Sequence, residues 1–181
     1  THAPRLAIGD GALGFWAAVD EAWPQTLQQR CWVHKTANVL NKMPKSLHGK
    51  AKDMLQEIWK SLTFEAANKA LDLFIKTFEA KYPDATACLE KDRQPLLTYY
   101  GFPAQHWKHV RTTNPIESTF STVRLRTRKT RGSGSRKACL TMVFKLVQSA
   151  QRGWRALCGS DLIPKVIDGI VFVDGELKLA A

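Results

Sequence analysis

A single acidic residue, Glu117, lies in the most basic stretch of the chain. Residues 93–160 hold thirteen Lys and Arg and no other Asp or Glu. The isolated carboxylate has two interpretations. With Asn114 as N-cap and Pro115 at the first helical position, Glu117 completes a capping box at the start of a helix. Alternatively, Glu117 binds Mg²⁺ against a phosphate diester, while nearby arginines neutralise a nucleic-acid backbone.

A second carboxylate, Asp10, follows a short apolar run at residues 5–9 and stands between Gly9 and Gly11. The pattern predicts a strand that ends in a tight turn. Ligands tend to collect at the carboxyl ends of strands in α/β sheets, so Asp10 is a candidate ligand-binding residue. The alternative, that Asp10 only forms the turn, stays open.

The segment from Arg124 to Lys137 holds seven Lys and Arg in fourteen residues and no acid. Such a run is often only a solvated face. Here it ends in the Gly/Ser-rich stretch KTRGSGSRK (129–137), which favours phosphate binding that is tolerant of sequence and strongly dependent on salt. The candidate DNA-binding residues are Arg111, Arg124, Arg126, Arg128, Lys129, Arg131, Arg136 and Lys137.

Cys31 and His34 are separated by two residues, which is a spacing found in zinc sites. The other nominal ligands, His106 and His109, lie more than seventy residues further on. Because so wide a gap carries little weight, we expect no zinc, and a zinc-stabilised nucleic-acid-binding module is the weakest alternative. The four cysteines are unevenly spaced, which favours reduced thiols.

The order of elements predicts how these residues are held. A strand at 5–9, a helix at 12–23, a second strand at 27–35 that includes Cys31 and His34, and a short helix at 35–43 predict a mixed or parallel α/β sheet. From residue 46 to about residue 100 the periodicity is helical, which predicts an all-helical insertion. Its two apolar stripes are core candidates: Met54, Leu55, Ile58, Trp59 and Leu62, then Ala66, Ala70, Leu71, Phe74, Ile75 and Phe78.

Beyond the insertion, a helix is expected from Asn114 to about Arg131. Its apolar face is formed by Ile116, Phe120, Val123 and Thr127, and Arg124, Arg128 and Arg131 follow Glu117 on the adjoining face. A second amphipathic helix is expected at 138–157. The tail at 170–177 is typical of a hairpin that turns at Asp174 and Gly175.

The bulk composition indicates which partners the chain can attract and where it is expected to be found. The 181 residues carry a formal charge of +11, which attracts polyanions. No apolar run approaches a membrane span, and the first residues do not resemble a signal peptide. We therefore expect an intracellular protein without a membrane partner.

Three segments together resemble the C-terminal catalytic half of bacterial Mutator-type insertion-sequence transposases. They are Gly9-Asp10-Gly11, RCWVHKTANVLNKMPK (30–45) and HWKHVRTTNPIESTFSTVRLRTRKTRGSGSR (106–136). The resemblance implies the C-terminal part of an RNase H-like fold with an all-α insertion, and three catalytic carboxylates. Asp10 matches the second carboxylate and Glu117 the third, whereas Cys31 and His34 match a C-x-x-H signature.

The implied domain plan is a partial catalytic core at 1–44, the helical insertion at 45–105, a core helix with the basic segment and a last helix at 106–160, and a tail at 161–181. The implied activity is cleavage and transfer of DNA strands with Mg²⁺ or Mn²⁺ bound by Asp10 and Glu117. The implied partners are double-stranded DNA at the element ends and the target, with an assembly of several copies. The implied location is the bacterial cytoplasm, at the nucleoid.

The family's first Asp lies on an earlier strand, which these 181 residues do not include. We therefore expect the chain alone to bind metal poorly and not to transpose DNA. The alternative function is non-enzymatic: a basic remnant that binds the element's DNA or inhibits full-length subunits.

Overall fold

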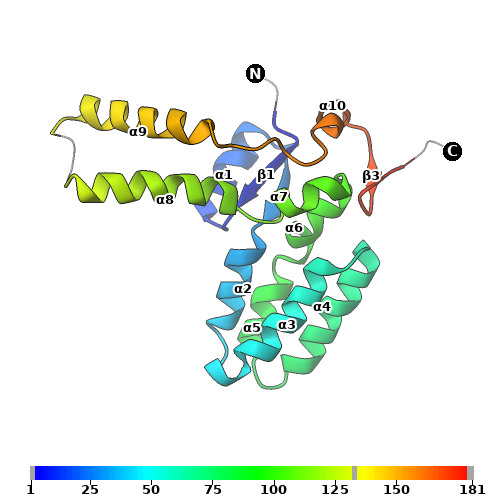
Figure 1. Ribbon diagram of the computed structural model, residues 1–181. Helices are drawn as coiled ribbons and strands as arrows, with labels where there is room; N and C mark the ends of the chain where they lie inside the picture. The colour runs from blue at the N-terminus through cyan, green and yellow to red at the C-terminus, as the bar shows by residue number, and fades with distance from the viewer. Residues whose placement is uncertain (1–2, 132–133, 179–181) are drawn as a thin grey trace. The chain divides into compact units, whose positions relative to one another are not determined.

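A computed structural model describes residues 3–131 and 134–178 of the chain, except for the side chain of Pro115. It divides into two compact units. One unit combines Thr1–Thr112 with Cys158–Ala181, and the other is Thr113–Leu157. Figure 1 shows the elements of both, which are predominantly helical with few, short strands. The α/β class with a helical majority is thus confirmed.

The larger unit begins with a strand, a helix and a strand: β1 (Leu6–Gly9), α1 (Leu13–Ala22) and β2 (Leu27–Arg30). The two strands pair in parallel, with Leu6 opposite Leu27 and Gly9 opposite Arg30. Parallel neighbours need a crossover, and α1 supplies it. The predicted parallel arrangement is therefore confirmed, and the carboxyl ends of both strands lie at the same edge.

The predicted second strand was too long. It ends at Arg30, and α2 (Trp32–Leu40) begins two residues later, so Cys31 is the N-cap and His34 lies in the first turn of the helix. The physical reason is periodicity: Trp32, Lys35 and Val39 are buried at helical spacing. A strand would alternate them between two faces.

The helical structure predicted for residues 46 to about 100 is confirmed, and its status as an insertion stays a prediction. After η1 (Lys45–Leu47) come α3 (His48–Lys60), α4 (Phe64–Phe78), α5 (Pro83–Glu90) and α6 (Arg93–Leu97), followed by η2 (Thr98–Gly101), η3 (Ala104–His106) and α7 (Trp107–Val110). Most of the buried side chains of the protein gather here, and α2 contributes Trp32 and Val39 to the same core.

The predicted stripes largely form this core, with corrections at their ends. Leu55, Ile58, Leu71 and Phe74 are fully buried. Leu62 is wrong as a core residue: it follows the end of α3 and is 81% exposed. The buried alanine at the start of α4 is Ala67, and Ala66 is exposed.

The C-terminal hairpin is also confirmed and is part of the larger unit. After η4 (Ser160–Leu162) and α10 (Ile163–Ile167), β3 (Phe172–Val173) pairs antiparallel with β4 (Glu176–Leu177). Asp174 and Gly175, which join them, have φ of 50° and 83°, as a primed two-residue turn requires.

The smaller unit contains two long helices, α8 (Asn114–Lys129) and α9 (Arg136–Gln151). Helix α9 begins where the Ser135 side chain accepts a hydrogen bond from the Ala138 amide, at 3.2 Å, and it ends before the predicted residue 157. The predicted apolar face of α8 is largely exposed: Ile116 is 63% exposed and Phe120 51%, and only Val123 is buried. Over the described part of the chain, no helix is both long and apolar enough to cross a membrane.

Candidate functional site

Asp10 lies where the sequence predicts it, directly after β1 at the carboxyl edge of the parallel pair. Its side chain is exposed, and Oδ1 accepts a hydrogen bond from the Ala12 amide at 3.0 Å. This bond belongs to the turn, which Gly11 completes with a φ of 101°. Both interpretations of Asp10 are thus compatible with its geometry, because the turn engages Oδ1 and the carboxylate still faces outward.

Cys31 and His34 lie side by side at the start of α2. The distance between Cys31 Sγ and His34 Nδ1 is 3.2 Å, within hydrogen-bonding range for sulfur. Cys31 is buried, at 1% exposure, and His34 is half-buried. The helix brings the two side chains together because residues three apart share a face.

His106 and His109 bind backbone groups. His106 Nε2 lies 2.8 Å from the carbonyl oxygen of Gly159, and His109 Nε2 accepts from the amide of Cys158 at 3.2 Å. Burial, with the charges of Lys108 and His106, lowers the pKa of His109, which keeps its ring neutral and able to accept. The two histidines therefore hold the chain at residues 158–159.

Glu117 lies in the first turns of α8, but the predicted cap was misplaced by one residue. The N-cap is Thr113, not Asn114, and the Thr113 hydroxyl donates to Glu117 Oε1. The Thr113 carbonyl also accepts from the Glu117 amide at 3.1 Å. The reason is the chain geometry at Thr113, whose φ of −88° and ψ of 1° precede the first helical residue, Asn114. Glu117 thus helps to start the helix and is half-exposed.

The two candidate carboxylates belong to different units, Asp10 to the larger and Glu117 to the smaller. Their meeting at one metal ion stays a prediction. Among the residues that the structure describes, no group of three or more His, Cys, Asp or Glu side chains could hold a metal ion. The chemistry of the donors fits Mg²⁺, because carboxylate oxygens are the protein ligands that this ion prefers.

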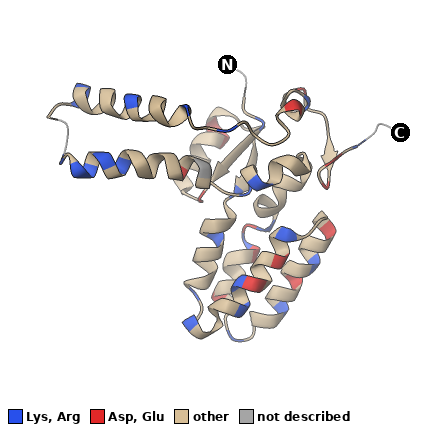
Figure 2. Cartoon of the chain, viewed as in Figure 1, with Lys and Arg blue, Asp and Glu red and all other residues tan. Residues whose placement is uncertain are grey.

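The candidate DNA-binding residues divide into two kinds. Seven are exposed in the smaller unit, at the end of α8, in the connection that follows and at the start of α9: Arg124, Arg126, Arg128, Lys129, Arg131, Arg136 and Lys137. Arg131 lies beyond the helix, with a φ of 51°, so only Arg124 and Arg128 continue the Glu117 face. Figure 2 shows this concentration of blue on α8, in contrast with the mixed red and blue of the helical insertion.

Arg111 is of the other kind. Its guanidinium donates to the carbonyls of Trp107 and Trp59, and it lies 5.0 Å from the centre of the Trp59 ring and 5.4 Å from that of Tyr99. These contacts give Arg111 a structural role, because a planar cation stacks well on aromatic rings. Its DNA-binding role stays a prediction.

Sequence reasoning missed a buried ion cluster beside the Asp10 turn, which consists of Arg30, Lys35 and Asp92. Asp92 Oδ2 accepts from Arg30 Nε at 2.9 Å and pairs with Lys35 Nζ. Lys35 Nζ also donates to the Cys88 carbonyl at 2.8 Å. A signal was present in the sequence, since Lys35 shares its helix face with apolar residues, and a cation buried in this way requires a carboxylate.

The charges of Lys35 and Arg30 determine the protonation state of the Asp92 carboxyl. Burial acts to raise the pKa of the Asp92 carboxyl, but Lys35 and Arg30 outweigh it, and the pKa lies below its ordinary value. Asp92 therefore stays ionised at neutral pH and ties the end of the helical insertion to β2 and α2.

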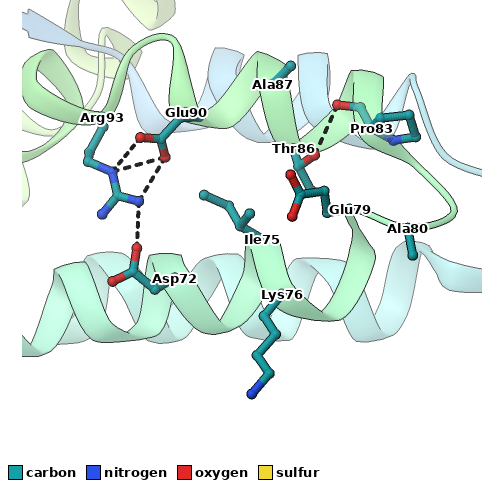
Figure 3. Close-up of a pocket in the computed structure, with 10 residues that line it drawn as sticks. All are labelled: Asp72, Ile75, Lys76, Glu79, Ala80, Pro83, Thr86, Ala87, Glu90 and Arg93. Atoms are coloured by element: carbon teal, nitrogen blue, oxygen red, sulfur yellow. Dashed lines mark hydrogen bonds and ion pairs between the residues drawn. The ribbon is translucent and has the colours of Figure 1, made fainter.

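A further hollow lies elsewhere, between α4 and α5 (Figure 3). It is a groove of about 990 Å³, and at one end Arg93 bridges Glu90 and Asp72 with contacts of 2.8 and 2.6 Å. None of the predicted site residues lines it.

The fold and the site together define a class: a predominantly helical α/β protein with a carboxylate at a strand end and a strongly basic helical hairpin. The family model of transposases of the Mutator family matches residues 3–156. The chain belongs to the Mutator family of transposases.

Relatives of known type agree with this assignment. Over 173 residues the chain is 56% identical to the transposase for insertion sequence element IST2 of Acidithiobacillus ferrooxidans, covering 96% of this chain and 58% of that protein. It is 52% identical to the transposase for IS6120 of Mycolicibacterium smegmatis, covering 97% of this chain and 54% of that protein. The chain thus spans a little over half the length of these relatives.

Proposed function

We propose that this chain is the catalytic segment of an insertion-sequence transposase, which cleaves and transfers DNA strands with Mg²⁺ or Mn²⁺. The observation that carries the proposal is the position of Asp10, at the carboxyl edge of a parallel strand pair in a chain of this family. The parallel β1–α1–β2 unit is what an RNase H-like core would contribute here. Asp10 and Glu117 would bind the metal, with a third carboxylate from outside these 181 residues.

In the proposed chemistry both carboxylates bind metal, each from a different element of the chain. Bound metal ions would activate the attacking oxygen and stabilise the leaving oxygen of a phosphodiester. Asp10 offers an exposed carboxylate from the turn after β1, and Glu117 offers one from a helix whose first turn it helps to stabilise. Two elements that approach from different parts of the chain can hold ligands on different sides of an ion.

A nicking assay on supercoiled DNA with Mg²⁺ or Mn²⁺ tests this proposal. We expect no cleavage by the 181-residue chain alone, since it holds two of the three carboxylates. We expect cleavage by a longer protein that adds the third, and its loss in Asp10→Asn and Glu117→Gln. Cleavage that survives both substitutions would refute the assigned roles.

The proposed DNA contact is the basic end of the smaller unit. The last turn of α8 contains three basic residues, Arg126, Arg128 and Lys129. Their charges complement the helix dipole, so their presence could be explained without a bound anion. Arg136 and Lys137 cannot be explained in this way, because they begin α9, where a positive charge is unfavourable. A bound phosphate would remove that conflict, since helix N-termini and arginines both attract anions.

Binding of the chain to a duplex at several salt concentrations tests this contact. Each lost phosphate contact should reduce the slope of log K against log salt by about 0.9. We expect this loss in Arg128→Ala and Arg136→Ala and no change in Lys69→Ala, an exposed lysine of α4 that pairs with Glu65. Equal slopes in all three variants would contradict the proposal.

The second candidate function is a non-enzymatic DNA-binding or inhibitory subunit. One observation favours it: all seven exposed basic candidates belong to the smaller unit, whereas Asp10 belongs to the larger unit. It predicts that DNA binding survives Asp10→Asn and that the chain lowers the activity of a full-length relative when the two are mixed. Under either function the proposed partners are double-stranded DNA and further copies of the chain, in the bacterial cytoplasm at the nucleoid.

A further inference from the structure

The turn that carries Asp10 is packed tightly on both sides by side chains. A Cβ added to Gly9 would lie 2.7 Å from Cζ2 of Trp16. A Cβ added to Gly11 would lie 1.5 Å from Nη1 of Arg30 and 2.1 Å from its Cζ. The Arg30 guanidinium therefore rests directly against the Gly11 backbone, in space that any other residue would fill.

Arg30 is held in this position from its other side. It ends β2 opposite Gly9, so its side chain starts at the same edge of the sheet as Asp10. Its Nε donates to Asp92 Oδ2 at 2.9 Å, and the residue is only 9% exposed. A continuous set of contacts thus leads from Asp92 through Arg30 to Gly11.

The hydrogen bonding of this cluster is incomplete. Within the described residues, two buried nitrogens have no hydrogen-bond partner, Arg30 Nη1 and Trp16 Nε1, and both side chains pack on this turn. A buried donor without a partner destabilises the folded state. Stability alone would favour an apolar side chain at residue 30, because Asp92 would keep Lys35 as its partner.

We propose that Arg30 is a positioning residue for Asp10: its guanidinium, fixed by Asp92, supports the Gly11 turn and thereby sets the direction of the Asp10 carboxylate. The planar group suits this task, since it fills a flat space that a flexible ammonium would leave open. The inference rests on the proposed function, in which the direction of the Asp10 carboxylate matters for metal binding.

Nuclear magnetic resonance of the 181-residue chain tests the inference. The three-bond coupling between the Asp10 amide nitrogen and its Cγ reports whether the side chain keeps one χ1 rotamer. The variants are Arg30→Met and Arg30→Lys. The matched control is Arg93→Met, which removes another arginine that pairs with carboxylates, Glu90 and Asp72. Thermal melting of each variant measures stability separately.

We expect a single Asp10 rotamer in the unchanged chain and in Arg93→Met, and averaging among staggered rotamers in both Arg30 variants. The melting temperature of Arg30→Met should stay the same or rise. An unchanged coupling in Arg30→Met would overturn the proposal. So would a lower melting temperature with altered couplings throughout β1 and β2, because Arg30 would then support the sheet in general.

Addition of Mn²⁺ to the same samples separates this inference from the proposed function. Broadening of the Gly11 and Ala12 amide signals, lost in Asp10→Asn, would support metal binding at Asp10. Mn²⁺ broadens nearby signals even when it binds weakly, so the poor affinity expected of the chain alone would not hide binding at Asp10. No broadening in the unchanged chain would therefore count against Asp10 as a metal ligand, whereas the rotamer result would still decide the role of Arg30.

Discussion

Asp92 shows how one residue can join parts of a chain that are far apart in sequence. It lies between α5 and α6, yet its carboxylate binds the last residue of β2 and a buried lysine of α2. Its removal would leave Lys35, at 2% exposure, without its carboxylate. An unpaired buried charge is among the most damaging changes that a single substitution can make.

We therefore predict that Asp92→Ala lowers the free energy of unfolding by about 3–5 kcal/mol. Asp72→Ala is the control, because it also removes a carboxylate paired with an arginine but from a side chain that is 64% exposed. The control should change stability by less than about 1 kcal/mol. Urea unfolding of both variants at pH 7 measures the difference, and equal effects would contradict the burial argument.

The contribution of Asp92 to folding stability changes with pH in a definite direction. Because the pKa of Asp92 is lower in the folded chain than its ordinary value of 3.8, the folded state favours the ionised form. This contribution is complete above the ordinary pKa and is lost as the pH falls through the lower folded-state value. We expect the stability difference between the unchanged chain and Asp92→Asn to shrink below about pH 4, as measured by urea unfolding at several pH values.

For single residues, the sequence identifies candidate site residues better than it identifies the side chains that they contact. Asp10 and Glu117 could be selected because charge, glycine spacing and helix-start signals are local. The Arg30–Asp92 pair could not, because its members are sixty-two residues apart and nothing local to either predicts the other. Arg111 was chosen for its charge, but its stacking on Trp59 depends on tertiary packing.

At the scale of elements, the helical insertion holds most of the apolar packing. We predict that Phe74→Ala, in the middle of α4 and fully buried, costs about 3–5 kcal/mol of stability. Leu62→Ala is the control from the predicted stripe: at 81% exposure it should change stability by less than about 0.5 kcal/mol. A large effect of Leu62→Ala in denaturant unfolding would show that the stripe was predicted correctly after all.

The turn of the C-terminal hairpin provides a second test. A Cβ at Gly175 would lie 2.6 Å from Cβ of Ala104 and 2.8 Å from the Trp107 ring, at a φ of 83°. Left-handed backbone alone makes Gly175→Ala unfavourable by about 1–2 kcal/mol, and the clash adds to this. Gly49→Ala in α3 meets nothing within 4 Å and should be neutral or slightly stabilising in thermal melting.

Elements with strong periodicity were predictable from the sequence, and their ends were less so. The second strand was extended into α2 because Cys31, Trp32 and Val33 suit a strand locally, whereas the buried face of the helix depends on the core that it meets. Helix α9 ends before Trp154, because apolar side chains alone do not continue a helix past Gly153.

The whole molecule consists of two units with unequal packing. The smaller unit has Val123 as its buried hydrophobic side chain among the described residues, whereas the core of the larger unit contains many. We predict that amides of α8 and α9 exchange with solvent through low-energy local opening and that those of α4 exchange only on global unfolding. Hydrogen exchange with mass spectrometry measures this difference, and equal protection would contradict it.

The predicted class and the predicted crossover hold at this scale because they depend on the order of elements. The distance between Asp10 and Glu117 does not follow from the order of elements, because residues 11–116 include an entire helical block, and their meeting at one metal ion stays a prediction.

The C-terminal hairpin also has a consequence for synthesis of the chain. Asp174 Oδ1 accepts from the Phe64 amide at 2.6 Å, and the Gly175 carbonyl accepts from the Ala104 amide at 3.0 Å. The hairpin thus fastens the start of α4 to the segment that follows the insertion. Phe64 precedes Asp174 by 110 residues, and Ala104 precedes Gly175 by 71. During synthesis these two hydrogen bonds of the insertion therefore form only after the hairpin has left the ribosome.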